Sequence, residues 1–170
     1  MQLPPLPQSA IVIAAQADDW RAAVTLAGEA LARSGAARPG YSAEMIRMIE
    51  EHGPYVVIAP GLALAHARPG PEVLADGLSI VTLATPVNFG HPYNDPVSVV
   101  LGLAVTSSSE HLHAVAAVAN VFNDSTAITD LASAGSAERV QEIMRGGAME
   151  DRASDPATPA PSEPASEDLV

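Results

Sequence analysis

Short and almost wholly apolar runs alternate along the chain with segments that have the period of an amphipathic helix. A short apolar run that ends at turn-forming residues is typical of a strand buried inside a sheet. Because such an alternation places both element types around one core, we expect an α/β fold with a mostly buried sheet. The apolar runs cover 10–14, 55–59, 62–65, 78–84 and 97–106, and the helical patterns cover about 18–33, 41–52, 108–122, 125–134 and 137–144.

Three of the expected helices begin with residues that can cap a helix. Asp18 or Asp19 can cap the first helix, and Ser42 is the expected cap of the second. Ser107 and Glu110 match the capping box, in which a serine N-cap is followed three residues later by glutamate. These residues predict where the helices start.

The length of the chain, 170 residues, suffices for one well-buried domain and leaves no room for two ordinary ones. We expect the domain to cover 10–146, after a flexible Pro-rich lead at 1–9. Residues 147–170 are rich in Ala, Pro, Ser and acidic side chains, with too little apolar content to fold. We therefore expect a disordered acidic tail there.

The charge balance is strongly acidic. The formal net charge is −12, from 20 acidic residues and 8 basic residues, all of them arginine. This balance argues against nucleic-acid binding, which needs a basic footprint, and suits a partner with a basic face. The absence of cysteine excludes a disulfide framework and a thiolate metal site. The N-terminus lacks the basic start and apolar core of a signal peptide, and we expect a cytoplasmic protein.

His66 and Arg68 follow a short apolar step that begins after the turn Pro60-Gly61. Side chains alternate faces along an extended segment, so these two side chains, two residues apart, are expected to point the same way. An imidazole can act as a nucleophile near neutral pH, and a guanidinium can hold the oxygens of a phosphoryl group. The pair is therefore a candidate phosphoryl-transfer site.

His111 is the second candidate site residue. It lies in the first turn of the helix that Ser107 is expected to cap, where free backbone N–H groups and the helix dipole favour phosphate. His91 has three open alternatives: it lines the same pocket, it lies at a partner interface, or it is solvated. We expect His52 and His113 to have structural roles only.

Other chemistries find little support in the sequence. There is no His-Glu-x-x-His, no Gly-x-Ser-x-Gly, no phosphate-cradling Gly-x-x-x-x-Gly-Lys and no dinucleotide fingerprint. His66, His91 and His111 could in principle form a three-histidine zinc site, but their spacing is not diagnostic. We expect neither a metal ion nor a cofactor.

Several blocks of the sequence together resemble one protein family, over residues 10–144. The segment 51–61 that leads into Ala65-His66-Ala67-Arg68-Pro69 resembles the enzyme IIA proteins of the bacterial phosphoenolpyruvate-dependent sugar phosphotransferase system. The continuation His-Ala-Arg-Pro points to the ascorbate-type branch of the fructose-mannitol superfamily. Weaker matches are Asp19-Trp20-Arg21-Ala22-Ala23, Asn88-Phe89-Gly90-His91 with Asn94-Asp95-Pro96-Val97, and Glu110-His111-Leu112.

The resemblance implies a central mixed sheet of about five strands flanked by helices. It also implies that His66 accepts a phosphoryl group from the phosphohistidine of the phosphocarrier protein HPr. His66 would then pass the group to a cysteine of enzyme IIB, which phosphorylates the sugar during transport through the membrane enzyme IIC. His111 would contact the phosphoryl group without carrying it, with Arg68 as a further stabiliser. Ala65 departs from the family, which usually has proline there.

Some functional questions stay open at this level. The resemblance implies ascorbate or a related sugar as the transported substrate, although enzyme IIA does not contact the sugar. A regulatory module whose phosphorylation state is sensed by a partner, with no role in transport, is the alternative function. The oligomeric state is also open, with a homodimer as one alternative.

Overall fold

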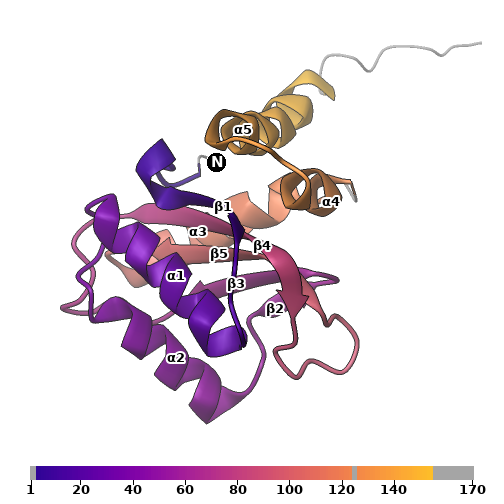
Figure 1. Ribbon diagram of the computed structural model, residues 1–170. Coiled ribbons are helices and arrows are strands. Elements are labelled where there is room, and N and C mark those ends of the chain that lie inside the picture. Colours follow the sequence, from indigo (N-terminus) through magenta and orange to yellow (C-terminus); the bar gives the residue numbers. More distant parts are fainter. Residues whose placement is uncertain (1–2, 124–125, 155–170) are drawn as a thin grey trace, which may run out of the picture.

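The computed structural model describes residues 3–123 and 126–154 and contains a five-stranded sheet with helices on both faces (Figure 1). β1 runs parallel to β4, and β3 runs parallel to β5, whereas β4–β5 and β2–β3 are antiparallel pairs. The expected α/β fold with a mixed sheet is therefore confirmed. In sheet order the strands are β1 (Ile11–Ala15), β4 (Gly77–Val87), β5 (Val97–Ala104), β3 (Leu62–His66) and β2 (Val57–Ala59).

The helices form two layers that enclose the sheet. A short 3-10 helix, η1 (Gln8–Ala10), precedes β1. Helices α1 (Trp20–Arg33) and α2 (Tyr41–His52) lie on one face, and α3 (Ser108–Val121), α4 (Ala127–Ala132) and α5 (Ala137–Ser154) lie on the other (Figure 1). Within 3–123 and 126–154, none of these helices combines the length and apolarity that crossing a membrane requires.

Alternation along β3 divides its side chains between two cores. Ala63 and Ala65 belong to the core under α1 and α2, whereas Leu62 and Leu64 belong to the core under α3, α4 and α5. Side chains two apart on a strand share a face, so His66 is directed to the side on which α3 lies.

Two of the predicted helix caps are confirmed. The Asp19 carboxylate accepts a hydrogen bond of 2.9 Å from the Ala22 N–H at the start of α1. The Ser107 hydroxyl accepts a hydrogen bond of 3.2 Å from the Glu110 N–H at the start of α3. Each cap satisfies one of the backbone donors that a helix start leaves unpaired.

The prediction that Ser42 caps α2 is wrong. The helix begins at Tyr41, as the sequence pattern predicts, but its N-cap is Gly40 and it has no side-chain cap bond. The buried Ser42 hydroxyl instead donates to the Thr25 carbonyl at 3.3 Å and lies against Gly28, where an added Cβ atom would collide with it. Ser42 therefore serves a close contact between α1 and α2, which a capping pattern cannot distinguish from a cap.

The last helix is longer than the sequence pattern predicts. It continues through Gly146 and Gly147 to Ser154, because a glycine inside a helix costs only about 1 kcal/mol relative to alanine and good helix formers follow. The predicted domain boundary after 146 therefore falls inside α5. The rest of the expected tail, 155–170, lies outside the described residues.

Candidate functional site

His66 lies at the carboxyl end of β3, opposite Leu103 of the parallel strand β5. The register places the turn Pro60-Gly61 at one end of this strand pair and His66 at the other. His66 is half-buried, while Ala65 and Ala67 on either side are buried. A side chain at this point can face a cavity while its backbone stays in the sheet.

The His66 ring is held by one hydrogen bond that identifies its tautomer. Nδ1 lies 2.8 Å from the carbonyl oxygen of Leu64, and a carbonyl can only accept, so Nδ1 carries the proton and donates. The lone pair is therefore on Nε2. Burial lowers the pKa of His66, the bond to Leu64 partly offsets this effect, and the nearby His111 lowers the pKa further. The lowered pKa favours the neutral imidazole, in which Nε2 is the ring nitrogen with a free lone pair.

The structure brings His111 next to His66, as the sequence suggested it could. The two ring centroids are 5.0 Å apart, at an interplanar angle of 47°. His111 lies in the first turn of α3, whose start is capped by Ser107. Its Nδ1 atom is buried and has no hydrogen-bond partner among the described residues. A buried nitrogen without a partner is unusual and is consistent with a site that binds a further polar group.

Arg68 completes the set of predicted residues at this site. Its side chain is exposed, and within the described part of the chain no ion pair involves it. The guanidinium is therefore available to an incoming anion. His66, Arg68 and His111 line one cavity of about 640 Å³, together with Met48, His52, Tyr55, Ala67, Pro69, Ser108 and Leu112.

Two aromatic side chains in this pocket were missed by the sequence analysis. The Tyr55 ring meets His66 edge-on at 5.8 Å, and the His52 ring meets Tyr55 edge-on at 6.3 Å. No spacing in the sequence predicts this position of Tyr55, because the register between β2 and β3 shifts between Val57 and Ala59 and does not follow from the Pro60-Gly61 turn alone. His52, for which we expect a structural role, lies in the wall of this pocket.

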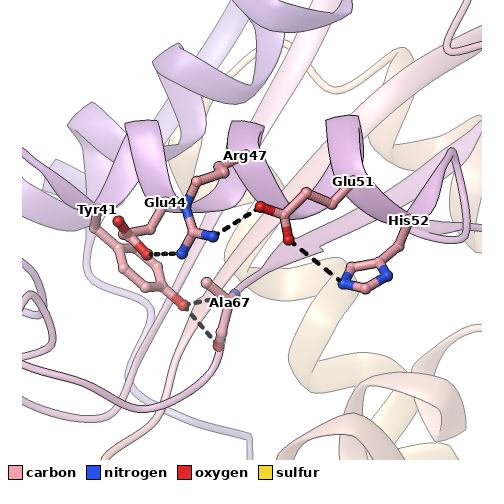
Figure 2. A network of polar contacts seen from close by, with 6 residues as sticks. All are labelled: Tyr41, Glu44, Arg47, Glu51, His52 and Ala67. Atoms are coloured by element: carbon pink, nitrogen blue, oxygen red, sulfur yellow. Dashed lines mark hydrogen bonds and ion pairs between the residues drawn. The ribbon is translucent and has the colours of Figure 1, made fainter.

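His52 also ends a row of charged contacts along α2 (Figure 2). Arg47 pairs with Glu44 at 2.7 Å and with Glu51 at 2.9 Å, and Glu51 lies 3.9 Å from His52. These side chains are about half exposed, so each pair contributes little to stability. Of these acidic groups, Glu51 is the one that lies next to a residue of the cavity wall, His52.

His91 does not line the pocket, which corrects one of its three alternatives. Its loop connects β4 to the start of β5 at Val97, whereas His66 pairs with Leu103, six residues further along β5. At roughly 3.3 Å per residue this separation is about 20 Å. The His91 Nδ1 atom accepts the N–H groups of Tyr93 and Asn94, both at 3.1 Å. His91 therefore helps to shape its own loop.

The zinc alternative also required His91 to join the other two histidines. Within residues 3–123 and 126–154, no three His, Asp or Glu side chains are arranged to hold a metal ion.

His113, two residues beyond His111, is largely exposed and lies 3.9 Å from Glu110 on the outer side of α3.

Comparison with known proteins places these residues in context. Residues 5–146 match the family model described as "Phosphoenolpyruvate-dependent sugar phosphotransferase system, EIIA 2". The chain is 32% identical over 137 residues to the ascorbate-specific PTS system EIIA component of Salmonella choleraesuis (strain SC-B67). The matched region covers 80% of this chain and 89% of that protein.

Solved structures agree with this assignment. A PTS IIA protein (PtxA) from Streptococcus mutans superposes with a TM-score of 0.76 at 34% identity, covering 84% of this chain and 91% of that one. The nitrogen regulatory protein IIA-Ntr from Neisseria meningitidis superposes with a TM-score of 0.70 at 26% identity, covering 82% of this chain and 95% of that one.

Proposed function

Because the chain belongs to the EIIA 2 family of the phosphoenolpyruvate-dependent sugar phosphotransferase system, we propose that it is a cytoplasmic phosphocarrier that is phosphorylated on Nε2 of His66. The donor in this proposal is the phosphohistidine of HPr, and the acceptor is a cysteine of enzyme IIB, which serves the membrane enzyme IIC. One observation carries the proposal. The Nδ1–H of His66 is bonded to the Leu64 carbonyl, which leaves Nε2 as the free nitrogen in a pocket shared with His111 and Arg68.

The two transfer steps balance without a further reactant. In the first, the Nε2 lone pair forms a bond to phosphorus while the bond from phosphorus to the donor imidazole breaks. In the second, a cysteine thiolate attacks phosphorus and the electron pair of the N–P bond returns to Nε2. The Leu64 carbonyl, which accepts the Nδ1–H hydrogen bond, stabilises the positive charge that develops on the ring in the first step and is lost again in the second.

His111 and Arg68 are the proposed stabilisers of the transferring group. Arg68 offers a guanidinium without a protein counter-ion among the described residues, and His111 offers a ring nitrogen at a helix start. In both steps the charge of the phosphoryl oxygens changes little, so orientation and fixed donors can supply most of the catalysis.

The rim of the pocket suits a protein partner rather than a small molecule. Leu112 is 71% exposed and Tyr55 is 41% exposed, and both line the cavity that contains His66. Exposed apolar side chains around a reactive group are typical of a docking surface. The net charge of −12 favours partners with a basic face.

The substrate of the parent transport system is proposed to be ascorbate or a related sugar. The support is indirect and comes from the relative in Salmonella choleraesuis, whose printed name is ascorbate-specific. Deletion of the gene should impair growth on ascorbate as sole carbon source and spare growth on glucose. Normal growth on ascorbate, with a defect on another sugar of the phosphotransferase system, would refute the substrate but not the phosphocarrier.

A regulatory module is the second candidate, favoured by the likeness to the nitrogen regulatory protein from Neisseria meningitidis. Such a module would accept the phosphoryl group on the same histidine and would have no enzyme IIB to donate it to. Incubation of the phosphorylated protein with the enzyme IIB encoded nearest to it separates the two. Loss of the phosphoryl group to a IIB cysteine supports the carrier, and retention of it supports the regulator.

Phosphorylation of the protein tests the core of the proposal. Incubation with phosphoenolpyruvate, enzyme I and HPr should add one acid-labile phosphoryl group per chain. His66→Ala should abolish this labelling, whereas the control His113→Ala, which removes an exposed histidine of α3, should retain it. Labelling of His66→Ala to the wild-type extent would show that another residue carries the group.

A further inference from the structure

A tyrosine from α2 reaches the point where β3 leaves the sheet. Tyr41 is the first residue of α2 and only 1% exposed, and its ring extends from the helix to the backbone of Ala67 (Figure 2). Ala67 directly follows His66, and Arg68 comes next. A side chain from a different layer of the fold therefore contacts the backbone between the two predicted site residues.

The Tyr41 hydroxyl is bonded to both strands at this point. It accepts the Ala67 N–H at 3.0 Å and donates to the Leu103 carbonyl at 2.7 Å, with the Ala67 carbonyl oxygen at 3.3 Å. His66 pairs with Leu103, so a parallel ladder continued by one residue would join the Ala67 N–H directly to the Leu103 carbonyl. The hydroxyl connects these same two groups through α2.

The Tyr41 hydroxyl is suited to hold the backbone of Ala67 in one position. Burial raises the pKa of Tyr41 to about 12, so the group stays protonated and keeps its donor hydrogen across the physiological range. Both backbone partners are buried, and a buried group bonded on both sides has one preferred position. Ala65 and Ala67, which flank His66, carry only methyl groups and do not restrict the backbone themselves.

We propose that Tyr41 is a positioning residue for phosphoryl transfer: its hydroxyl sets where the chain leaves β5 after His66, and so aims the His66 ring and Arg68 into the shared pocket. This role rests on the proposed phosphocarrier function. Tyr41 does not touch the reacting atoms and acts only through the backbone of Ala67. Misplacement of a reacting group by about 1 Å can cost a factor of about 10² in rate, so the effect should appear in kcat.

The test compares two variants that each remove one buried hydroxyl. Tyr41→Phe keeps the ring and leaves the Ala67 N–H unpaired. The control Thr82→Val keeps its shape and removes a hydroxyl that accepts the Ala14 N–H at 2.8 Å, opposite Val99 near the other end of β5. We expect both to lose thermal stability. Only Tyr41→Phe should also lose about ten- to a hundredfold in kcat for phosphorylation by phospho-HPr, at unchanged KM because the docking surface is intact.

The outcomes separate the positioning role from the function on which it rests. A wild-type protein that accepts no phosphoryl group would overturn the phosphocarrier function and the role of Tyr41 with it. A labelled wild type with equal kcat in Tyr41→Phe and Thr82→Val would leave the phosphocarrier intact and overturn the positioning role.

Amide hydrogen exchange of the wild-type protein provides a second measurement that does not depend on the folding of a variant. The Ala67 amide, although outside β3, should exchange as slowly as the amides of that strand. Exchange as fast as that of exposed loop amides would also overturn the proposal.

Discussion

Replacement of His111 by alanine should separate activity from stability. The ring centroid of His111 lies 5.0 Å from that of His66, close enough for both rings to contact a phosphoryl group on Nε2. Removal of one fixed donor from such a site typically slows the reaction by about 10²–10³, which corresponds to about 2.7–4 kcal/mol of transition-state stabilisation. His111→Ala should therefore still be labelled at His66 but transfer its phosphoryl group to enzyme IIB about 10²–10³ times more slowly.

The same change should affect folding very little. In the free protein the buried Nδ1 atom of His111 has no partner among the described residues, and an unsatisfied buried polar atom costs about 1–3 kcal/mol. Removal of the ring relieves this cost and gives up part of its packing against His66. Alanine is also the better helix former, by about 0.5 kcal/mol. These opposed contributions should leave the free energy of unfolding within about 1 kcal/mol of the wild-type value.

Two measurements on the same preparations check this separation. Urea unfolding gives the free energy, and quenched-flow transfer of labelled phosphate to enzyme IIB gives the rate. His113→Ala is the control, since it removes a largely exposed histidine from the same helix and should change neither. Wild-type transfer rates in His111→Ala would refute the role of the ring. A loss of 3 kcal/mol or more in stability would refute the structural reasoning, because the slow transfer could then reflect misfolding.

The remaining predictions concern pH and Arg68. Burial holds the pKa of His66 in the folded protein below its usual 6.5, so the unfolded chain binds more protons as the pH falls. The contribution of His66 to stability is therefore complete above about pH 6.5. Below that pH it declines, by at most about 1.4 kcal/mol per pH unit. The free energy of unfolding should be measured for wild type and for His66→Ala between pH 5.5 and 7.5. As the pH falls, the wild type should lose more stability than His66→Ala does. A difference between the two proteins that stays constant over this range would contradict a lowered pKa of His66. Arg68→Ala removes an exposed side chain with no ion pair in the described part of the chain. The free energy of unfolding should therefore change by no more than about 0.5 kcal/mol. Transfer to enzyme IIB should slow markedly, and an unchanged rate would show that the guanidinium does not act on the phosphoryl group.

The sequence allowed the strands to be predicted because each is an apolar run bounded by turn residues. A capping box and a strand end identified His111 and His66 as candidates. Their placement side by side could be expected only from the family resemblance, since neither pattern fixes strand order. What could not be predicted were contacts across layers. The sequence pattern predicts that Ser42 is a helix cap, because it does not show that Gly28 of another helix lies against the Ser42 hydroxyl. In the same way, no spacing links Tyr41 to Ala67, because their contact depends on how α2 lies over the end of β3.

The edge of the sheet next to His66 has a consequence for the regiochemistry of phosphorylation. In a regular antiparallel ladder, every second pair of facing residues exchanges both of its backbone hydrogen bonds. Leu64 donates its N–H to the Val56 carbonyl at 2.8 Å, but its own carbonyl is taken by the His66 ring, since β2 extends only from Val57 to Ala59. A phosphohistidine can exist as either of two ring isomers, and this carbonyl occupies the nitrogen that would give one of them. A β2 that began before Val57 would compete for the same carbonyl and leave the ring free to turn. If His66 is phosphorylated as proposed, the late start of β2 therefore favours the isomer with the phosphoryl group on Nε2.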